Sequence, residues 1–277
     1  MDRRRALQTL VAGAGASILY DGTTVAGTPL PADGQGTALF FAPHPDDEVL
    51  QQLVEIMWHV SEGWHVVVVD GSNGDDTVAI QYVNGDIPCD YHGYRHVPPS
   101  RLVPGDIGRA RIHEQRSACE IAGVHEYVPG RVPDAALTVD GWRKIILAHA
   151  PRLRDGDRVF APTPWESTSG LGNPQHGDAG VALKQLLDEP GKLPRVTAFY
   201  TVFSRYWDQP GCPDGTTRGF PSREHEAKAI SAAAVYQAYN PSAGSYGIGW
   251  CHSVQRDFEA GFAVTTGPRY LRQRYHL

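Results

Sequence analysis

Short apolar runs alternate with amphipathic segments from residue 37 onward. Uninterrupted β-branched and aromatic residues predict strands, and apolar residues recurring every three or four positions predict helices. The expected strands cover residues 37–42, 64–69, 125–128, 158–162 and 195–203. The expected helices cover about 46–59, 107–122, 137–153, 178–187 and 222–239. This alternation predicts an α/β fold, in which a mostly parallel sheet lies between helices on both faces, in three α/β/α layers.

The two ends of the chain differ from this pattern. Residues 1–36 carry Arg3 and Arg4 before a weakly apolar, glycine-rich stretch, which indicates a twin-arginine export signal or else a disordered N-terminus. We therefore expect export, with a cytoplasmic location as the alternative. The apolar stretch is too short for stable membrane insertion. Residues 240–277 are expected to be a less regular segment of the single domain formed by residues 37–277.

Composition excludes some partners. The 277 residues carry a formal charge of −6, and the arginines are scattered singly, so we expect no binding to nucleic acid. The four cysteines form no C-x-x-C pair, which argues against a zinc ribbon or a redox dithiol. Cys119 lies on a helical pattern and is expected to be buried, whereas the other three could form a disulfide after export: Cys89, Cys212 and Cys251.

The sequence His-Pro-Asp-Asp-Glu at residues 44–48 directly follows the first expected strand. His44 and Asp47 stand three residues apart, so they can face the same way at the start of a helix and bind one metal ion. Asp46 lies between them and faces elsewhere, where it could take a proton from metal-bound water. A simple helix N-terminus capped by Asp46 is the alternative interpretation.

A second histidine is expected to complete the site. His176 follows the strand at residues 158–162, and ligands of parallel sheets bind beyond the carboxyl ends of strands. His44, Asp47 and His176 would leave an open coordination position, as in catalytic zinc sites. A histidine at a helix start is also often a cap or a surface residue.

These residues give the chain its family resemblance. The pentapeptide at 44–48, the segment Arg111-Ile112-His113-Glu114 and the later Tyr236-Gln237 resemble the PIG-L or LmbE-like superfamily of zinc-dependent de-N-acetylases. The resemblance covers about residues 37–239 and implies a Rossmann-like fold, with residues 37–277 as one LmbE-like deacetylase domain. It also implies Zn²⁺ on His44, Asp47 and His176, and Asp46 as general base and acid.

One departure from the family concerns the second motif. The family often has His-Pro-Asp-His, and this chain has Asn-Pro-Gln-His at residues 173–176. Asn173 can donate a hydrogen bond but cannot carry the positive charge of an imidazolium. The residues that could supply that charge instead are Arg111, Arg223, His225 and His252.

Substrate contacts are expected from loops near the metal motif. Asp75 lies in a polar loop after the second strand, and Trp165 and Glu166 follow the fourth. Asn173 and Arg111 complete the candidate substrate-binding residues. The aromatic residues of the long loop at 71–105 could stack on a sugar or simply fill the loop.

Three classes of function remain open. The first is a metal-dependent N-deacetylase acting on a small-molecule amino-sugar conjugate, with zinc or iron as the native metal. The second is a nucleotide-binding Rossmann protein, although no G-x-G-x-x-G follows the first strand. The third is a noncatalytic, zinc-containing glycan-binding protein of the same fold, which the departure at Asn173 supports.

Overall fold

The computed structural model describes residues 34–75, 77–89, 91–249 and 273–276. Their largest sheet has the strand order β3-β2-β1-β4-β5-β9-β6. The first five of these strands run parallel, and β9 is antiparallel to both β5 and β6. The strands are β1 (Thr37–Ala42), β2 (His65–Asp70), β3 (Glu126–Val128), β4 (Arg158–Pro162), β5 (Thr197–Val202), β6 (Thr216–Arg218) and β9 (Gln273–His276).

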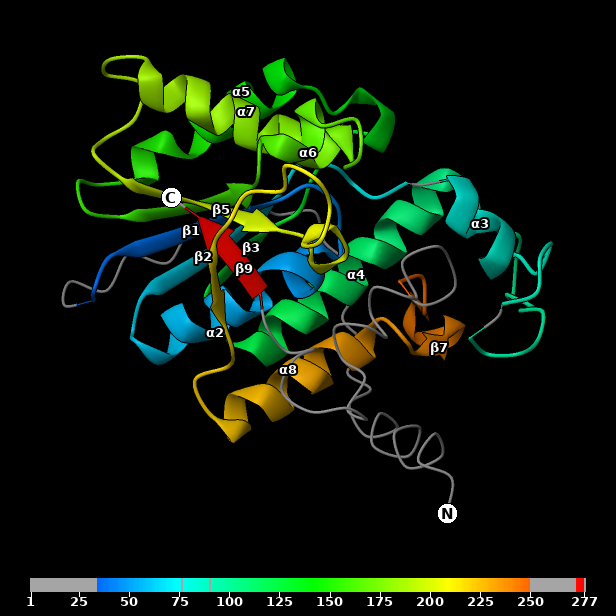
Figure 1. The fold of residues 1–277 in the computed structure, drawn as a ribbon. Coiled ribbons are helices and arrows are strands. Elements are labelled where there is room, and N and C mark those ends of the chain that lie inside the picture. The colour runs from blue at the N-terminus through cyan, green and yellow to red at the C-terminus, as the bar shows by residue number, and fades with distance from the viewer. Residues whose placement is uncertain (1–33, 76, 90, 250–272, 277) are drawn as a thin grey trace.

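Helices cover both faces of this sheet (Figure 1). One face is covered by α5 (Val139–His149) and α7 (Pro174–Asp188), with the short α6 (Trp165–Thr168) beside α7. The other is covered by α2 (Leu53–Ser61), α4 (Pro104–Ala122) and α8 (Arg223–Val235). The α/β fold expected from the sequence is confirmed.

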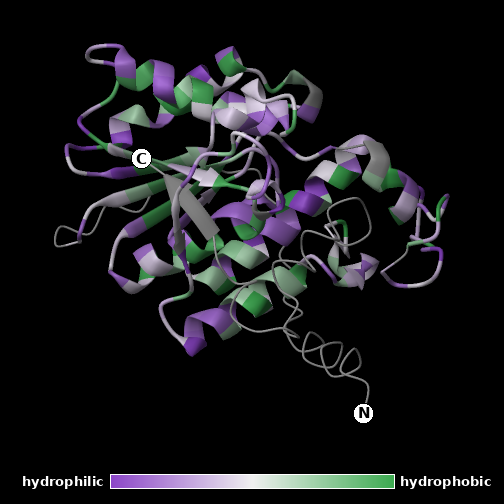
Figure 2. Cartoon of the chain, viewed as in Figure 1, coloured by the Kyte–Doolittle hydropathy of each residue, from purple (hydrophilic) through white to green (hydrophobic). Residues whose placement is uncertain are grey.

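Alternate residues of β1 contribute to the two hydrophobic cores that lie on opposite faces of the sheet. Phe40 packs among the buried residues on the side of α2, α4 and α8, and Phe41 packs on the side of α5 and α7. Every residue of β1 and β2 is buried. Such strands read as continuous apolar runs because neither face meets water. The covering helices carry both hydrophobic and hydrophilic residues along their length (Figure 2).

Several predicted boundaries were wrong. The helix predicted at residues 178–187 begins at Pro174. The one predicted at 137–153 is divided into α5 and η4 (Ala150–Arg152), and a separate turn, η3 (Asp134–Ala136), precedes it. The loop predicted at 71–105 contains a short helix, α3 (Thr77–Val83). The segment at 240–277 contributes a hairpin of β7 (Tyr239–Asn240) and β8 (Ser245–Tyr246), followed by β9.

The winding direction of the sheet changes between β1 and β4. From β1 the chain moves to β2 and β3 on one side, and from β4 to β5 on the other. The crevice at such a reversal is where open α/β sheets bind ligands. Within the described residues, no helix is both long and apolar enough to cross a membrane.

Candidate metal centre

The turn after β1 has an unusual backbone conformation at Asp46. Asp46 has a φ of 147°, a backbone conformation that non-glycine residues rarely adopt and that costs about 1–3 kcal/mol. The Asp47 amide donates to the His44 carbonyl at 3.1 Å, which closes the turn. A π-helical turn, η2 (Glu48–Gln52), follows and continues into α2. Strain of this kind concentrates at functional sites, because the surrounding fold must hold it in place.

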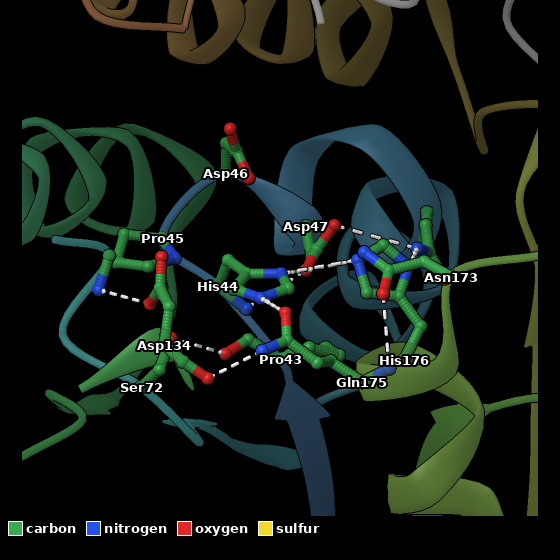
Figure 3. A network of polar contacts seen from close by, with 12 residues as sticks. Pro43, His44, Pro45, Asp46, Asp47, Ser72, Asp134, Asn173, Gln175 and His176 are labelled. Atoms are coloured by element: carbon green, nitrogen blue, oxygen red, sulfur yellow. Dashed lines mark hydrogen bonds and ion pairs between the residues drawn. The ribbon is translucent and has the colours of Figure 1, made fainter. Parts of the chain in front are cut away.

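His44, Asp47 and His176 converge, as the sequence led us to expect. His44 Nδ1 lies 3.1 Å from Asp47 Oδ2 and 3.1 Å from His176 Nε2. His176 Nε2 lies 3.3 Å from Asp47 Oδ2. Two ligands of a tetrahedral zinc ion, each about 2.0–2.1 Å from the metal, lie about 3.3 Å apart. The three donor atoms therefore form a triangle of the size that one such ion requires, and Figure 3 shows the side chains turned toward one another.

The outer nitrogen of each imidazole has its own acceptor. His44 Nε2 lies 3.0 Å from Gln175 Oε1, and His176 Nδ1 lies 3.1 Å from Glu166 Oε2. The Gln51 amide also lies 2.9 Å from His176 Nδ1, but the carboxylate is the stronger partner for a proton there. Protons on these outer nitrogens leave the lone pairs of His44 Nδ1 and His176 Nε2 facing Asp47. Metal-binding histidines are held in this way, so the residues fit a divalent cation.

His44 and Asp47 stabilise each other's charged forms. Burial disfavours the His44 imidazolium, but the hydrogen bond and charge of Asp47 outweigh burial and raise the pKa of His44 to about 9. Burial also disfavours the Asp47 carboxylate, yet the charge of His176 and the bond from His44 lower the pKa of Asp47 to about 2. Without a cation, the positive charge of the His44 imidazolium compensates this carboxylate. A divalent ion would take over that compensation and displace the protons.

Asp46 is set apart from the three converging residues (Figure 3). Its Oδ2 accepts a 2.9 Å bond from Nη2 of Arg111, and both side chains are buried. Burial raises the pKa of Asp46 to about 6, against the lowering effect of the Arg111 charge. Arg111 also donates to the carbonyls of Pro45 and Gly74. Gly74 has a φ of 68°, and a Cβ there would meet Pro45 at 2.8 Å, so only glycine brings this loop so close.

Other predicted contact residues have structural partners. The Asn173 side chain caps α7 by accepting a bond from the Gln175 amide at 3.0 Å. Asp75 accepts a bond from the Asp134 amide at 3.0 Å, and Trp165 packs against the ring of Tyr206. Glu166 is buried and lies against His176, and its contact with substrate stays a prediction.

The alternative sources of positive charge fall in different places. Arg111 is bound to Asp46, whereas Arg223 is exposed on the first turn of α8. His225 contacts Ser222, the N-cap residue of the same helix. His252 and Cys251 lie outside the described residues, as does the predicted export signal. The disulfide therefore stays a prediction, whereas Cys119 is buried on α4, as predicted.

The sequence does not predict that Glu166 and Gln175 support the two histidines. Glu166 stands opposite His176 because α6 packs tightly on α7: a Cβ on Gly177 would meet the Ser167 amide nitrogen at 1.9 Å. Gln175 occupies the place of the aspartate in the His-Pro-Asp-His pattern, so a neutral amide, not a carboxylate, supports His44. The Asn-Pro pair at 173–174 could have indicated the helix start, since asparagine is a common N-cap and proline is common at the first helical position.

The fold and the site together define a class: a Rossmann-like α/β protein with a candidate His-Asp-His metal site where the winding of its sheet reverses. Residues 39–187, more than half of the chain, match the family described as PIG-L: GlcNAc-PI de-N-acetylase. The chain belongs to this family.

Solved structures with the same fold include a zinc-inhibited form of teicoplanin deacetylase Orf2, which is 14% identical, with a TM-score of 0.57 and coverage of 86% of this chain and 96% of that one. N,N'-diacetylchitobiose deacetylase from Pyrococcus horikoshii is 16% identical, with a TM-score of 0.54 and coverage of 88% and 84%. GalB, the 4-carboxy-2-hydroxymuconate hydratase from Pseudomonas putida, is 15% identical, with a TM-score of 0.52 and coverage of 87% and 95%. Among curated proteins, no sequence matches the chain. At these identities the structural likeness shows the fold alone.

Proposed function

We propose that this protein is a metal-dependent de-N-acetylase that hydrolyses the N-acyl, typically acetyl, group of an N-acylglucosamine-containing glycoconjugate. The observation that carries the proposal is the triangle of His44 Nδ1, Asp47 Oδ2 and His176 Nε2, with sides of 3.1–3.3 Å. Membership of the PIG-L family, described by its de-N-acetylase activity, supports the same reaction.

Hydrolysis of an amide needs an activated water, stabilisation of a tetrahedral oxyanion and a proton for the departing amine. A divalent cation bound by the three side chains would supply a Lewis acid and would lower the pKa of water to about 7. Two nitrogen ligands and one carboxylate suit zinc, and iron is the other metal that this donor set accommodates.

Asp46 is the residue that moves the proton. With a pKa of about 6 it is ionised at neutral pH, yet it is basic enough to accept a proton from water. Arg111 binds one carboxylate oxygen and fixes the side chain, so the other oxygen is the one that exchanges the proton. The same carboxyl group then donates this proton to the amine nitrogen as the carbon–nitrogen bond breaks, which regenerates the carboxylate.

Stabilisation of the oxyanion differs from the family pattern. Asn173 uses its side-chain oxygen to cap α7, so its amide NH₂ group is the part that can donate a hydrogen bond to substrate. This donor carries no charge. A cation held by His44, Asp47 and His176 would therefore have to supply more of the stabilisation than in relatives that have a histidine at this position, and the loss of metal is expected to abolish turnover.

The substrate is expected to be a small amino-sugar conjugate that binds at the crevice beyond β1 and β4. Two deacetylases of the same fold are named for different compounds, teicoplanin and N,N'-diacetylchitobiose, so the aglycone is left open. We also propose export by the twin-arginine segment, which favours a secreted or envelope glycan over a cytosolic thiol precursor as the substrate.

The test is a free-amine assay across acylated glucosamine conjugates that differ in aglycone and acyl length, on metal-loaded and chelated protein. The proposal predicts amine release from at least one conjugate, loss of release with chelator, and recovery with added zinc or iron. The departure at Asn173 favours one alternative, a noncatalytic glycan-binding protein. Saturable binding of the same conjugates with no amine release, despite a full complement of metal, would establish that alternative and refute the hydrolase.

A further inference from the structure

A second cluster of metal-ligating side chains lies away from the pentapeptide, in the loop between α3 and α4. Cys89, His92 and His96 each offer one ligand atom, and these three atoms lie within 4.8 Å of one another. We propose that this cluster is a second metal site, which binds one zinc ion and fastens the loop to the β7–β8 hairpin.

The backbone of the loop brings the three residues together. Cys89 and Tyr94 form an antiparallel bridge, in which the Cys89 amide donates to the Tyr94 carbonyl at 3.0 Å. The Gly93 amide returns to the Cys89 carbonyl at 2.8 Å, and the φ of 74° at Gly93 allows the tight turn. Cys89 and His92 therefore project from the same side of one turn, and His96 follows as the chain leaves it.

The donor atoms are of the right kind and are nearly in place. Cys89 Sγ lies 3.2 Å from His92 Nδ1. Ligands of a tetrahedral zinc at about 2.3 Å for sulfur and about 2.0 Å for nitrogen lie about 3.5 Å apart, so this pair needs little adjustment. A thiolate with two imidazoles is a set that selects zinc over magnesium or calcium, which prefer oxygen ligands. With three ligands from the protein, the fourth position is left to water.

The surroundings of the cluster orient the two imidazoles. His92 Nε2 lies 3.0 Å from the Gln237 carbonyl, so it carries the proton and leaves the lone pair of Nδ1 facing Cys89. The ring of His96 stacks on Tyr239, with centroids 3.9 Å apart and 21° between the planes. Both partners precede or begin the β7–β8 hairpin, so a metal ion would connect the loop to that hairpin through both histidines.

The β7–β8 hairpin is in turn bound to α4, the helix that carries Arg111. The amides of Tyr246 and Gly247 both donate to Glu114 Oε1 at 2.9 Å, and Glu114 lies on α4, one turn after Arg111. The proposed ion therefore stabilises a wall built from the loop, the hairpin and α4. It lies outside the His44 site and does not depend on the proposed reaction.

The experiment uses His176→Ala, which disables the first site and leaves the second intact. We expect this variant to retain one equivalent of zinc after dialysis, where the wild type retains two. Replacement of that zinc by cobalt should give a near-ultraviolet sulfur-to-cobalt charge-transfer band, which the His-Asp-His site cannot produce because it has no sulfur. Adding Cys89→Ser to this variant should remove both the band and the retained metal, whereas Cys212→Ser should remove neither.

A folded His176→Ala protein that retains no zinc and gives no cobalt–sulfur band would overturn the proposal, as would peptide mapping that finds Cys89 in a disulfide. Because the band is read in a variant without the first site, failure of the second site is distinguishable from failure of the proposed hydrolase. The latter would appear as absent amine release in metal-loaded wild-type protein.

Discussion

The contact between Glu166 and His176 gives the most specific prediction about metal affinity at the candidate metal centre. Glu166 Oε2 lies 3.1 Å from His176 Nδ1, and both side chains are almost wholly buried. Glu166→Gln keeps the shape and a hydrogen-bond acceptor but removes the negative charge. A hydrogen bond to a charged group contributes about 1.5–3 kcal/mol and one between neutral groups about 0.5–1.5 kcal/mol. The loss of about 1–1.5 kcal/mol corresponds to zinc binding about 5–13-fold weaker, near the lower end of the 10–100-fold effects of such partners.

The assay is competition for zinc against a chromophoric chelator, performed on the wild type and on Glu166→Gln. Glu55→Gln is the matched control, since Glu55 is another buried glutamate, but it pairs with Arg218 away from the site. Zinc affinity should fall in Glu166→Gln and stay unchanged in Glu55→Gln. Equal affinity of wild type and Glu166→Gln would show that Glu166 does not orient the imidazole, and it would refute the tautomer assigned to His176.

Three further predictions concern proton transfer by Asp46 and the buried hydrogen bond between Tyr236 and Glu48. Asp46→Asn should keep the metal and lose nearly all turnover, so normal activity at full metal content would remove Asp46 as the base. Arg111→Gln should raise the pKa of Asp46, because it removes the positive charge beside the carboxylate. Since Asp46 acts in its deprotonated form, the acid limb of the pH profile of kcat/KM should move upward by about 1–3 pH units. An acid limb at the wild-type pH in metal-loaded protein would contradict this. Tyr236→Phe removes the 2.7 Å hydrogen bond from the Tyr236 hydroxyl to Glu48 Oε1 and should lower the free energy of unfolding by about 1–3 kcal/mol. Urea titration measures this change, and an unchanged unfolding midpoint would argue against a stabilising role of the bond.

The central strands were the most predictable part of the fold. The predicted bounds of β1 and β4 agree with the structure because strands buried on both faces leave uninterrupted apolar runs in the sequence. The helix α7 begins four residues before the predicted start at residue 178, because Asn173 is its N-cap and Pro174 its first helical residue. The helix α3 is short and lies within a polar loop, so it lacks the repeated apolar face on which prediction depends.

The candidate site also has a part that the sequence predicts and a part that it does not. His44, Asp47 and His176 could be anticipated, because the carboxyl ends of neighbouring parallel strands meet at one edge of the sheet. Their partners could not, since the contact of Glu166 with His176 depends on how closely α6 approaches α7 at Gly177. The cluster of Cys89 and the two loop histidines was also missed, because the turn at Gly93 that gathers them produces no periodic signal.

The most direct test of the account is the return of activity when chelated protein is titrated with zinc, followed as free amine released from a responsive N-acylglucosamine conjugate. The account predicts that wild-type protein regains turnover as the His44 site fills, and that His176→Ala regains none at any zinc concentration that leaves the protein folded. Full turnover in metal-free protein, or equal reactivation of His176→Ala, would contradict it.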